Sequence, residues 1–287
     1  MQAQIDRANT GFWNELCGTH LARSARVDDD SPEALRHFDE AYFRMYPYLL
    51  PLIRPERMTG LRVLEIGLGF GSVGQKLAEA GAHYHGLDIA DGPVRITNHR
   101  LRLLGCRRSA AVGSALDVPF PPGLFDFVVS IGCLHHTGDV RRCFAEVYRV
   151  LRPGGTAVLM LYNKYSYRRW LRYPAATLGE LWREKLGGGS EPRNVPAGVR
   201  KLWDRNVAGE AAPETVLLSV GQLRRMLAPF EQLSFTRQTG RTPVRRRWSP
   251  RNWLRPLLFA TVGRWLGLDI YVEARKGTKA EVARRAA

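Results

Sequence analysis

Short apolar runs alternate with segments of helical spacing between Leu61 and about Tyr162. Each run is seven or eight residues long, which suits a strand buried on both faces of a sheet. The five runs along this stretch are LRVLEIG, AHYHGLDI, SAAVGSA, FDFVVSIG and TAVLMLY. Their regular spacing predicts an open, mostly parallel α/β sheet in residues 61–163.

Two of the connections in this stretch have the apolar spacing of helices. SVGQKLAEA lies between the first and second runs. Between the fourth and fifth runs, Asp139 is placed to cap a helix that carries Val140, Phe144, Val147 and Leu151. Strand, helix and strand in this order, with short connections, indicate parallel neighbours.

The segments on either side of this core have a different pattern. Residues 1–60 are expected to form a helical segment that serves as a lid, with Phe38, Tyr42, Met45 and Leu49 at helical spacing. Tyr42 and Tyr46 could close over a cofactor, although such an aromatic stripe more often packs in a core. Residues 164–213 are basic, aromatic and rich in glycine, and we expect them to form a cap inserted above the core.

Residues 214–276 are expected to complete the core. A helix is predicted at about 219–227, followed by strands at about 230–238 and 268–275. An insertion at 241–268, RTPVRRRWSPRNWLRPLLFATVGRWLGL, separates these two strands and is both basic and rich in tryptophan. Residues 277–287 are a charged tail.

Length and composition exclude several classes of protein. With 287 residues, 45% hydrophobic and 24% charged, the chain matches an elaborated globular domain and not a disordered tail. Its longest uncharged run covers twelve residues, Phe127 to Gly138, well short of the roughly 20 that a membrane-spanning helix needs. The start, MQAQIDRANTGFW, has no apolar signal core, so we expect a cytoplasmic protein. The four cysteines form no CxxC pair.

The charge is distributed unevenly along the chain. Residues 1–160 hold 18 Lys and Arg against 17 Asp and Glu, whereas residues 161–287 hold 25 against 10. Arginines mixed with tryptophans at 241–268 suit an anionic membrane surface, a phosphorylated acceptor or a nucleic acid. Nucleic acid is the least favoured partner, because the chain contains no recognisable RNA-binding module. A plain structural insertion with solvated arginines is the remaining interpretation.

The strongest chemical signal is VLEIGLGFGSVG at residues 63–74, a strand that leads into a glycine turn and a helix. Asp88 ends the next strand, where a carboxylate suits the two hydroxyls of a ribose. The glycine pattern also matches the GxGxxG fingerprint of dinucleotide sites, which alone is weak. Glu65 would repel a pyrophosphate but attract an ammonium and a sulfonium group, so S-adenosylmethionine is favoured over NAD.

These motifs, with GLDIA, Val112 to Phe120, FDFVVSIGCLHHTGD and VYRVLRPGGTAVLMLYN, resemble the class I S-adenosylmethionine-dependent methyltransferases. The similarity covers about residues 60–163 and is greatest to the small-molecule branch that includes the ubiquinone and menaquinone methyltransferases. It implies a Rossmann-like seven-stranded sheet, six strands parallel and one antiparallel, with helices on both faces and an α-helical cap. It also implies that the cofactor is held by Glu65, Gly67, Gly69, Gly71, Asp88, Ser114, Ala115, Ser130 and Ile131.

One of these positions departs from the family pattern. The relatives usually have an aspartate where this chain has Ser114, and that aspartate accepts a hydrogen bond from the adenine amino group. A hydroxyl still accepts, but without charge. Asp117 is the other candidate for this contact.

The candidate catalytic residues follow the fourth and fifth strands. His135 and His136 lie where the active site of such a sheet opens, so either could be a general base, or the pair could only pack locally. Tyr162, with its neighbours Asn163, Lys164 and Tyr165, leaves the fifth strand at the same edge. No further His or Cys lies at ligand spacing, so no metal is expected.

The sequence therefore predicts a methyltransferase that acts on an O, N or C nucleophile of a small-molecule acceptor. The net positive charge of residues 161–287 is compatible with an anionic, phosphorylated or lipid-like acceptor. It is also compatible with contact between the protein and a membrane surface. An NAD(P)-dependent oxidoreductase and a nucleoside-cofactor-binding protein without turnover are the alternatives. The oligomeric state stays open.

Overall fold

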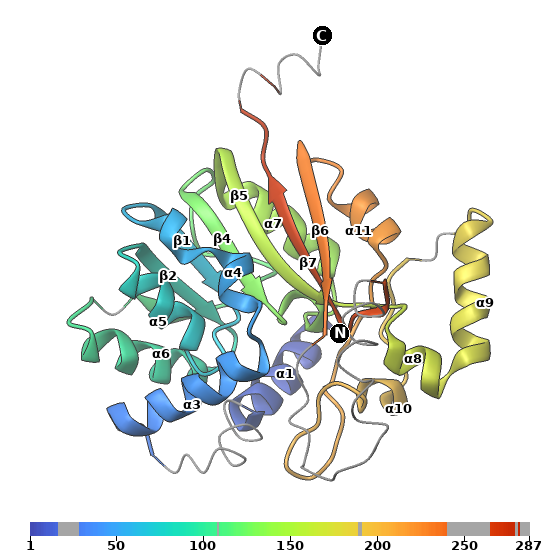
Figure 1. Ribbon diagram of the computed structural model, residues 1–287, viewed down its shortest axis with the longest axis horizontal. Helices are drawn as coiled ribbons and strands as arrows, with labels where there is room; N and C mark the ends of the chain where they lie inside the picture. Colours follow the sequence, from blue (N-terminus) through green and yellow to red (C-terminus); the bar gives the residue numbers. More distant parts are fainter. Residues whose placement is uncertain (17–28, 108, 189–190, 240–264, 279–280, 282–287) are drawn as a thin grey trace, which may run out of the picture.

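A computed structural model describes residues 1–16, 29–107, 109–188, 191–239, 265–278 and 281. Its centre is one seven-stranded sheet with helices on both faces (Figure 1). The strands are β1 (Arg62–Ile66), β2 (His83–Asp88), β3 (Ala110–Val112), β4 (Phe125–Ile131), β5 (Leu151–Tyr162), β6 (Gln232–Gln238) and β7 (Asp269–Arg275). Every strand lies within or beside an apolar run that predicts it, so the α/β class is confirmed.

The strand order in the sheet is β3-β2-β1-β4-β5-β7-β6. β7 runs antiparallel to both β5 and β6, and its Val272 pairs with Leu159 on one side and Phe235 on the other. The other pairs are parallel, which confirms six parallel strands and one antiparallel strand. The chain reverses its direction of winding between β1 and β4, and open α/β sheets bind ligands at such a point.

Four helices connect the strands: α5 (Ser72–Glu79), α6 (Asp91–Leu103), α7 (Val140–Val150) and α11 (Val220–Met226). Asp139 caps α7 as expected, since its side chain accepts a hydrogen bond from the backbone N–H of Arg142. α6 has no clear apolar period in the sequence. Its inner face carries Thr97 and Arg100, both fully buried, so polar residues interrupt the stripe.

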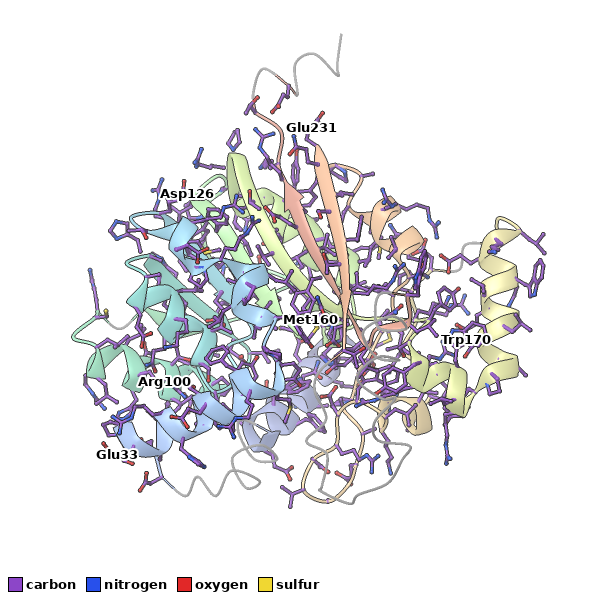
Figure 2. All side chains as sticks on the ribbon, viewed as in Figure 1. Glu33, Arg100, Asp126, Met160, Trp170 and Glu231 are labelled. Atoms are coloured by element: carbon purple, nitrogen blue, oxygen red, sulfur yellow. The ribbon has the colours of Figure 1, made fainter. Side chains whose placement is uncertain are left out.

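The N-terminal segment contributes α1 (Gln2–Leu16), α3 (Pro32–Met45), α4 (Leu49–Ile53) and the 3-10 helix η1 (Pro55–Met58). A buried ion pair fastens α3 to the core, where the Arg100 guanidinium donates to both carboxylate oxygens of Asp39 at 2.9 and 3.0 Å. The hydroxyl of Ser72 donates to the same carboxylate. Figure 2 places Arg100 beside α3. These bonds hold α3 next to the glycine turn that follows β1.

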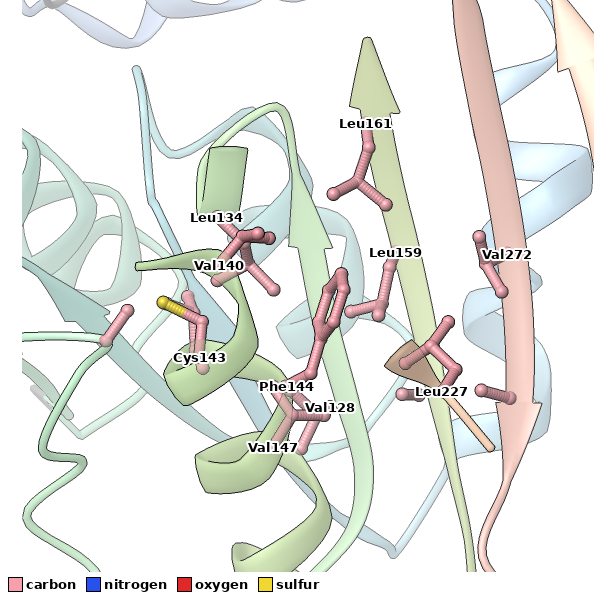
Figure 3. Close-up of a cluster of buried hydrophobic side chains, with 14 of the residues drawn as sticks. Val128, Leu134, Val140, Cys143, Phe144, Val147, Leu159, Leu161, Leu227 and Val272 are labelled. Atoms are coloured by element: carbon pink, nitrogen blue, oxygen red, sulfur yellow. The ribbon is translucent and has the colours of Figure 1, made fainter. Parts of the chain in front are cut away.

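Apolar side chains cover both faces of the sheet. On one face, Phe144 and Val147 of α7 and Leu227 after α11 pack against Leu159 and Val272 (Figure 3). The other face is covered by a second cluster from the strands, α4, η1, α5 and α6, with Leu49, Ile53, Met58, Val63, Leu77, Leu101, Val129 and Tyr271 at its centre. Each buried aliphatic side chain contributes roughly 1.5–3 kcal/mol, so the sheet is a rigid platform for its loops.

Beyond the C-terminal end of β5 the chain forms α8 (Tyr167–Arg172), α9 (Pro174–Lys185) and α10 (Ala197–Arg200). α8 and α9 lie at the margin of the molecule, to the right in Figure 1. Most of the predicted insertion at 241–268 lies outside the described residues, as does most of the tail. Among the helices that the structure describes, none is long and apolar enough to cross a membrane.

Candidate functional site

A cavity of about 680 Å³ opens beyond the C-terminal ends of β1, β2 and β4. One wall comes from the loops after these strands, and the others come from α1, α3 and the segment 168–205. The lining includes Asp6, Asn9, Trp13, Tyr42, Tyr46, Gly67, Gly69, Asp88, Ser114, Ala115, Ile131, His136, Arg168, Lys201, Trp203, Asp204 and Arg205. The cavity is thus built from three parts of the chain that are far apart in sequence.

The three predicted glycines after β1 have positive φ angles but different surroundings. A Cβ on Gly67 would lie 2.3 Å from the Cβ of Cys133, so the loop can approach the loop after β4 only with glycine there. A Cβ on Gly69 would meet no atom within 4 Å, because that position faces the cavity. Gly71 does not line the cavity, which differs from the expectation. It packs against α6, where a Cβ would come within 2.9 Å of Thr97 and Arg100.

Asp88 ends β2 with its carboxylate held in place. Its Oδ2 accepts a hydrogen bond from the backbone N–H of Leu68 at 2.8 Å, and its Oδ1 accepts one from Ala90 at 2.9 Å. Burial raises the pKa of Asp88, although these backbone bonds counteract the shift. A third backbone hydrogen bond, from Ile89, acts in the same direction, and the carboxylate itself borders the cavity.

Glu65 lies behind the glycine turn and is 2% exposed. Its Oε2 accepts a hydrogen bond from the Tyr84 hydroxyl at 2.6 Å. A small pocket of about 90 Å³, which also borders Gly67, Gly69 and Ile131, reaches Glu65. Burial raises the pKa of Glu65 to about 8, against the lowering effect of the Tyr84 hydroxyl.

Of the predicted positions in the loop after β3 and at the end of β4, three line the cavity and one does not. Ser114, Ala115 and Ile131 are part of the wall. The Ser114 hydroxyl accepts a hydrogen bond from the backbone N–H of Leu116, while Asp117 is exposed and lies outside the lining. Ser130 is fully buried and donates to the carbonyl of Ile66 at 2.8 Å, so it joins β4 to β1 and does not reach the cavity.

The two adjacent histidines have different environments in the 3-10 helix η2 (Leu134–His136). His136 lines the cavity, and its Nδ1 lies 2.7 Å from the carbonyl oxygen of Glu214, so Nδ1 carries the hydrogen. His135 is completely buried, and its ring packs against those of His136 and Tyr162, with centroids 4.2 and 4.1 Å away. Because His135 does not reach the cavity, the geometry does not support it as a base.

Tyr162 also lies behind the wall instead of forming it. Its hydroxyl donates to Oδ1 of Asp204 at 3.2 Å, and burial raises the pKa of the phenol well above its usual value. It therefore contacts a lining residue and does not itself face the cavity, contrary to the expectation that it acts in catalysis.

Asp204, whose side chain is 15% exposed, and the buried His136 form a close pair that the sequence does not reveal. Their Oδ2 and Nε2 atoms are 3.6 Å apart, and neither atom has a hydrogen-bond partner among the described residues. Burial lowers the pKa of His136 and raises the pKa of Asp204, so the proton affinities of the two groups converge. One proton can therefore be shared between them at the cavity wall.

α1 closes another side of the cavity through side-chain bonds to the loops after β2 and β4. Asn9 donates to the carbonyl of His136 at 2.7 Å, and Gln2 donates to the carbonyl of Thr137 at 3.0 Å. Asn14 accepts a hydrogen bond from the backbone N–H of Gly92. Trp13 lies against His136, with ring centroids 4.7 Å apart. No spacing in the sequence identifies these contacts, since they join residues about 80–135 positions apart.

Charged groups surround the cavity unevenly. Arg168, Lys201 and Arg205 contribute cations from the segment after β5, whereas Asp6 and Asp88 contribute carboxylates from other parts of the chain and Asp204 adds one beside Trp203. In the part of the chain that the structure describes, no three His, Cys, Asp or Glu side chains are grouped as a metal site requires. The cysteines described, Cys106, Cys133 and Cys143, are free thiols.

Comparison with known proteins identifies part of this chain. Residues 64–159 match a family described as "Methyltransferase domain". This stretch runs from β1 to β5, so it includes the glycine turn, Asp88, Ser114, Ile131 and the histidine pair.

Individual relatives are similar over the same region. Phosphoethanolamine N-methyltransferase 2 of Caenorhabditis elegans is 33% identical over 107 residues, which are 37% of this chain and 24% of that protein. Demethylmenaquinone methyltransferase of Tropheryma whipplei is 30% identical over 132 residues, 43% of this chain and 53% of that protein. The chain thus spans between a quarter and about half of the length of these relatives.

Among solved structures, the fold resembles an S-adenosylmethionine-dependent methyltransferase from Mesorhizobium loti. The TM-score is 0.52 at 20% identity, and the match covers 81% of this chain and 98% of that one. At this level of identity the likeness extends to the fold alone.

Proposed function

The chain belongs to the class I S-adenosylmethionine-dependent methyltransferase family through its domain at residues 64–159, and we propose that it transfers a methyl group to a small-molecule acceptor. The observation that carries this proposal is the composition of the 680 Å³ cavity. Gly69, Asp88 and Ile131 line it from the family domain, whereas Trp203 and Asp204 line it from outside that domain. A cofactor and an acceptor can therefore meet in one space.

The residues present fit the cofactor. Gly69 leaves open space where any side chain would project, and Asp88 offers two fixed oxygens for two adjacent hydroxyls. Ser114 and Ala115 would border the adenine, and Glu65 would neutralise the ammonium group. Gly71 and Ser130 would support this site from behind. When bound, the cofactor supplies an electrophilic methyl group on a sulfonium centre.

The pair of His136 and Asp204 is proposed to take up the proton of the acceptor. The proton that the acceptor atom loses on methylation would pass to Nε2 of His136 or to Oδ2 of Asp204, whichever is free, and the cofactor would leave as a neutral thioether once its sulfur–methyl bond is broken. The Nδ1 bond to the Glu214 carbonyl fixes the ring so that Nε2 faces Asp204. Tyr162 donates to the other oxygen of Asp204 and would hold the carboxyl group in position. Alignment of the reacting atoms would supply most of the acceleration, up to roughly 7–11 kcal/mol.

We propose that the acceptor carries an anionic group such as a phosphate. Arg168, Lys201 and Arg205 supply three cations beside the cavity, while Trp13 and Trp203 supply apolar walls. The relatives named for phosphoethanolamine and demethylmenaquinone support a small molecule, one phosphorylated and one a quinone. A lipid headgroup and a free phosphorylated metabolite share this chemistry. A cytoplasmic location stays a prediction from the sequence.

The segments outside the family domain are proposed to control access. Residues 1–60 would act as a lid through α1 and α3, and residues 164–213 as a cap through the segment that carries Arg168 and Asp204. Residues 214–276 would complete the core through β6 and β7. Opening of α1 would break its bonds to the loop after β4 and to the start of α6 before either ligand could leave.

Two experiments test the proposed function. Calorimetry should detect binding of S-adenosylhomocysteine and no binding of NAD(P), which separates this proposal from an oxidoreductase. A screen of metabolite and lipid extracts with methyl-labelled cofactor should then label one class of compound, and the water-soluble and lipid fractions distinguish the two sources of an anionic acceptor. Binding of the cofactor without labelling in either fraction would favour a cofactor-binding protein without turnover.

A further inference from the structure

α9 presents its acidic residues to the protein instead of to solvent. Glu180 accepts hydrogen bonds from the Arg169 guanidinium at 2.9 and 3.0 Å. Glu184 accepts one from the Tyr165 hydroxyl at 2.6 Å and another from Ser219. Both carboxylates also lie within 4 Å of the buried ammonium group of Lys164. The inner side of this helix is therefore a polar and ionic contact.

The opposite side of α9 is apolar and exposed. Leu178, Trp182 and Leu186 are spaced by four residues, which places them on one side of a helix. Their exposed fractions are 45%, 57% and 80%, and Leu171 at the end of α8 is 80% exposed. A helix on the surface of a globular protein normally has the reverse arrangement, with its apolar stripe against the core. Exposed leucine and tryptophan side chains gathered in one place indicate an interaction site.

Cations flank this apolar side. Arg172, Arg183 and Lys185 are all exposed. At 100° per residue, Lys185 and Arg183 fall on opposite edges of the stripe formed by Leu178, Trp182 and Leu186. No free carboxylate from α9 accompanies them, because Glu180 and Glu184 are bound on the inner side. We give the name outer face of α9 to seven exposed residues, two at the end of the preceding helix α8 and five along the outer side of α9 and its C-terminal end: Leu171, Arg172, Leu178, Trp182, Arg183, Lys185 and Leu186.

We propose that the outer face of α9 is a docking surface for an anionic lipid bilayer. An apolar stripe with tryptophan at its centre and cations along its edges is the pattern of a helix that lies in a membrane interface. The long stems of Arg and Lys let their charges reach the phosphates while the leucines enter the acyl region. α9 stands at the margin of the molecule, where a flat membrane surface could reach it (Figure 1). Trp170 of α8 lies on the other side of α9, toward the protein (Figure 2).

Charge favours a bilayer over a second copy of the chain. A symmetric contact between two outer faces would bring the three cations of one copy toward those of the other. An anionic membrane supplies the opposite charge at every position of the face. Positions 161–287 hold 25 basic and 10 acidic residues, and this net positive charge would also attract an anionic membrane from a greater distance.

The position of the face gives docking a consequence for the cavity. Arg168, at the start of α8, lines the cavity, and Leu171 and Arg172 at the end of the same short helix belong to the outer face. A docked protein would hold its cation-lined side close to the headgroups. The proposal concerns membrane contact and does not depend on methyl transfer.

Co-sedimentation with vesicles tests the proposal on the full chain. The probes are vesicles of phosphatidylcholine alone and vesicles with an equal amount of phosphatidylglycerol, each at low and high ionic strength. Wild type should bind only the mixed vesicles. A variant with Leu178→Gln, Trp182→Gln and Leu186→Gln keeps the net charge, and its partition coefficient should fall at least about tenfold. Arg172→Gln, Arg183→Gln and Lys185→Gln together should lower it about a hundredfold, or about fivefold for each cation.

Matched control variants distinguish binding through the outer face of α9 from nonspecific electrostatic or hydrophobic binding through other surfaces. Leu103→Gln with Leu104→Gln changes two exposed leucines at the end of α6, and it should leave binding unchanged. Arg36→Gln, Arg44→Gln and Arg107→Gln remove three exposed cations elsewhere, and they should reduce binding by less than the three cations of the outer face. S-adenosylhomocysteine affinity should be the same in every variant, which shows that each one folds and keeps the cavity.

Three outcomes would overturn the proposal. The first is wild type that does not bind the mixed vesicles at low ionic strength. The second is equal binding by wild type and the Leu178, Trp182 and Leu186 variant, because contact would then occur through another surface. The third is a dimer in analytical ultracentrifugation that the same variant dissociates, which would make a second copy the occupant. Brominated lipid gives an independent measurement, since Trp182→Phe should remove most of the tryptophan quenching it causes in wild type.

Discussion

The carboxyl group of Glu65 accepts a hydrogen bond from the Tyr84 hydroxyl at 2.6 Å, with both side chains buried behind the glycine turn. Gly74 of α5 lies directly against this pair. A Cβ there would be 2.5 Å from the Tyr84 hydroxyl and 2.7 Å from Oε2 of Glu65. The helix can approach only because residue 74 is glycine, and the approach buries Glu65 deeply enough to raise its pKa to about 8.

Binding of S-adenosylhomocysteine should therefore depend on pH. The ligand's ammonium group favours ionised Glu65, whose fraction falls about tenfold for each pH unit below a pKa of about 8. We expect affinity to increase about 50-fold from pH 6 to pH 8, with proton release on binding at pH 7. Calorimetry in buffers of different ionisation enthalpy measures both quantities.

Two comparisons isolate the role of Glu65 in this dependence. Glu65→Gln keeps the shape and removes the charge, so its affinity should no longer change between pH 6 and pH 8. Methylthioadenosine lacks the ammonium group that S-adenosylhomocysteine carries, and wild type should bind it equally at both pH values. An unchanged pH dependence in Glu65→Gln would assign the titration to another group.

Gly69→Val should abolish cofactor binding. The substitution directs a branched side chain into the open space of the cavity, at a φ of 52° that valine rarely adopts. Gly105→Val is a matched control, because Gly105 has a φ of 69° and also has no atom within 4 Å, yet lies at the end of α6 outside the cavity. Both variants should lose similar thermal stability, and only Gly69→Val should lose affinity. If Gly69→Val bound S-adenosylhomocysteine as tightly as Gly105→Val does, the ligand would have to bind away from Gly69.

Asp88→Ala should weaken S-adenosylhomocysteine by about 1.5–3 kcal/mol, the range for hydrogen bonds to a charged group. The same change leaves the backbone N–H groups of Leu68 and Ala90 without their acceptor, so the melting temperature should fall as well. Calorimetry well below the melting temperature of the variant separates the two effects. Wild-type affinity in the folded variant would remove Asp88 from the ligand site.

Once an acceptor is known, the pair of His136 and Asp204 can be tested by kinetics. His136→Gln and Asp204→Asn should each lower kcat roughly 100- to 10,000-fold, as for loss of a general base. The affinity for S-adenosylhomocysteine should change little. The pH dependence of kcat/KM should lose the limb that reports the pair, which a purely structural role would not cause.

His135→Phe is the control for that experiment. Neither ring nitrogen of His135 has a hydrogen-bond partner among the described residues, and burial lowers its pKa well below the usual value. Replacement by an apolar ring removes two buried unsatisfied atoms, so thermal stability should be unchanged or higher. Turnover and its pH profile should match wild type. A large loss of kcat in this variant would return His135 to the list of catalytic candidates.

The sequence predicts the sheet well because each strand has a physical cause that is local. β1, β4 and β5 lie in predominantly apolar runs, and Asp139 and Ser219 cap α7 and α11. α6 is not predictable in the same way. Its buried Arg100 is stabilised by Asp39, 61 positions away, so the pattern makes sense only after the chain is folded.

The same difference between local and tertiary causes decides which residues of the candidate site can be predicted from the sequence. Gly69 and Asp88 are recognisable because a turn and a strand end fix them locally. Ser130 and His135 have the right position in sequence but the wrong side, since a one-residue step along a strand or a tight turn reverses the direction of a side chain. Asp204 and Trp13 belong to no motif, and only tertiary packing brings them beside His136.

The two kinds of cavity wall have separate origins in the chain, and this has an evolutionary consequence. The glycine turn, Asp88 and Ile131 belong to one contiguous stretch, while Trp13, Arg168 and Asp204 come from segments before and after it. Mutations in the segment that carries Arg168 and Asp204 should therefore alter the acceptor preference with little effect on cofactor binding, whereas α3 is bound to the glycine turn and supports both. Such modularity predicts that a chimera, with residues 64–159 exchanged for those of a relative, would keep the acceptor preference of the parent that supplies the flanks.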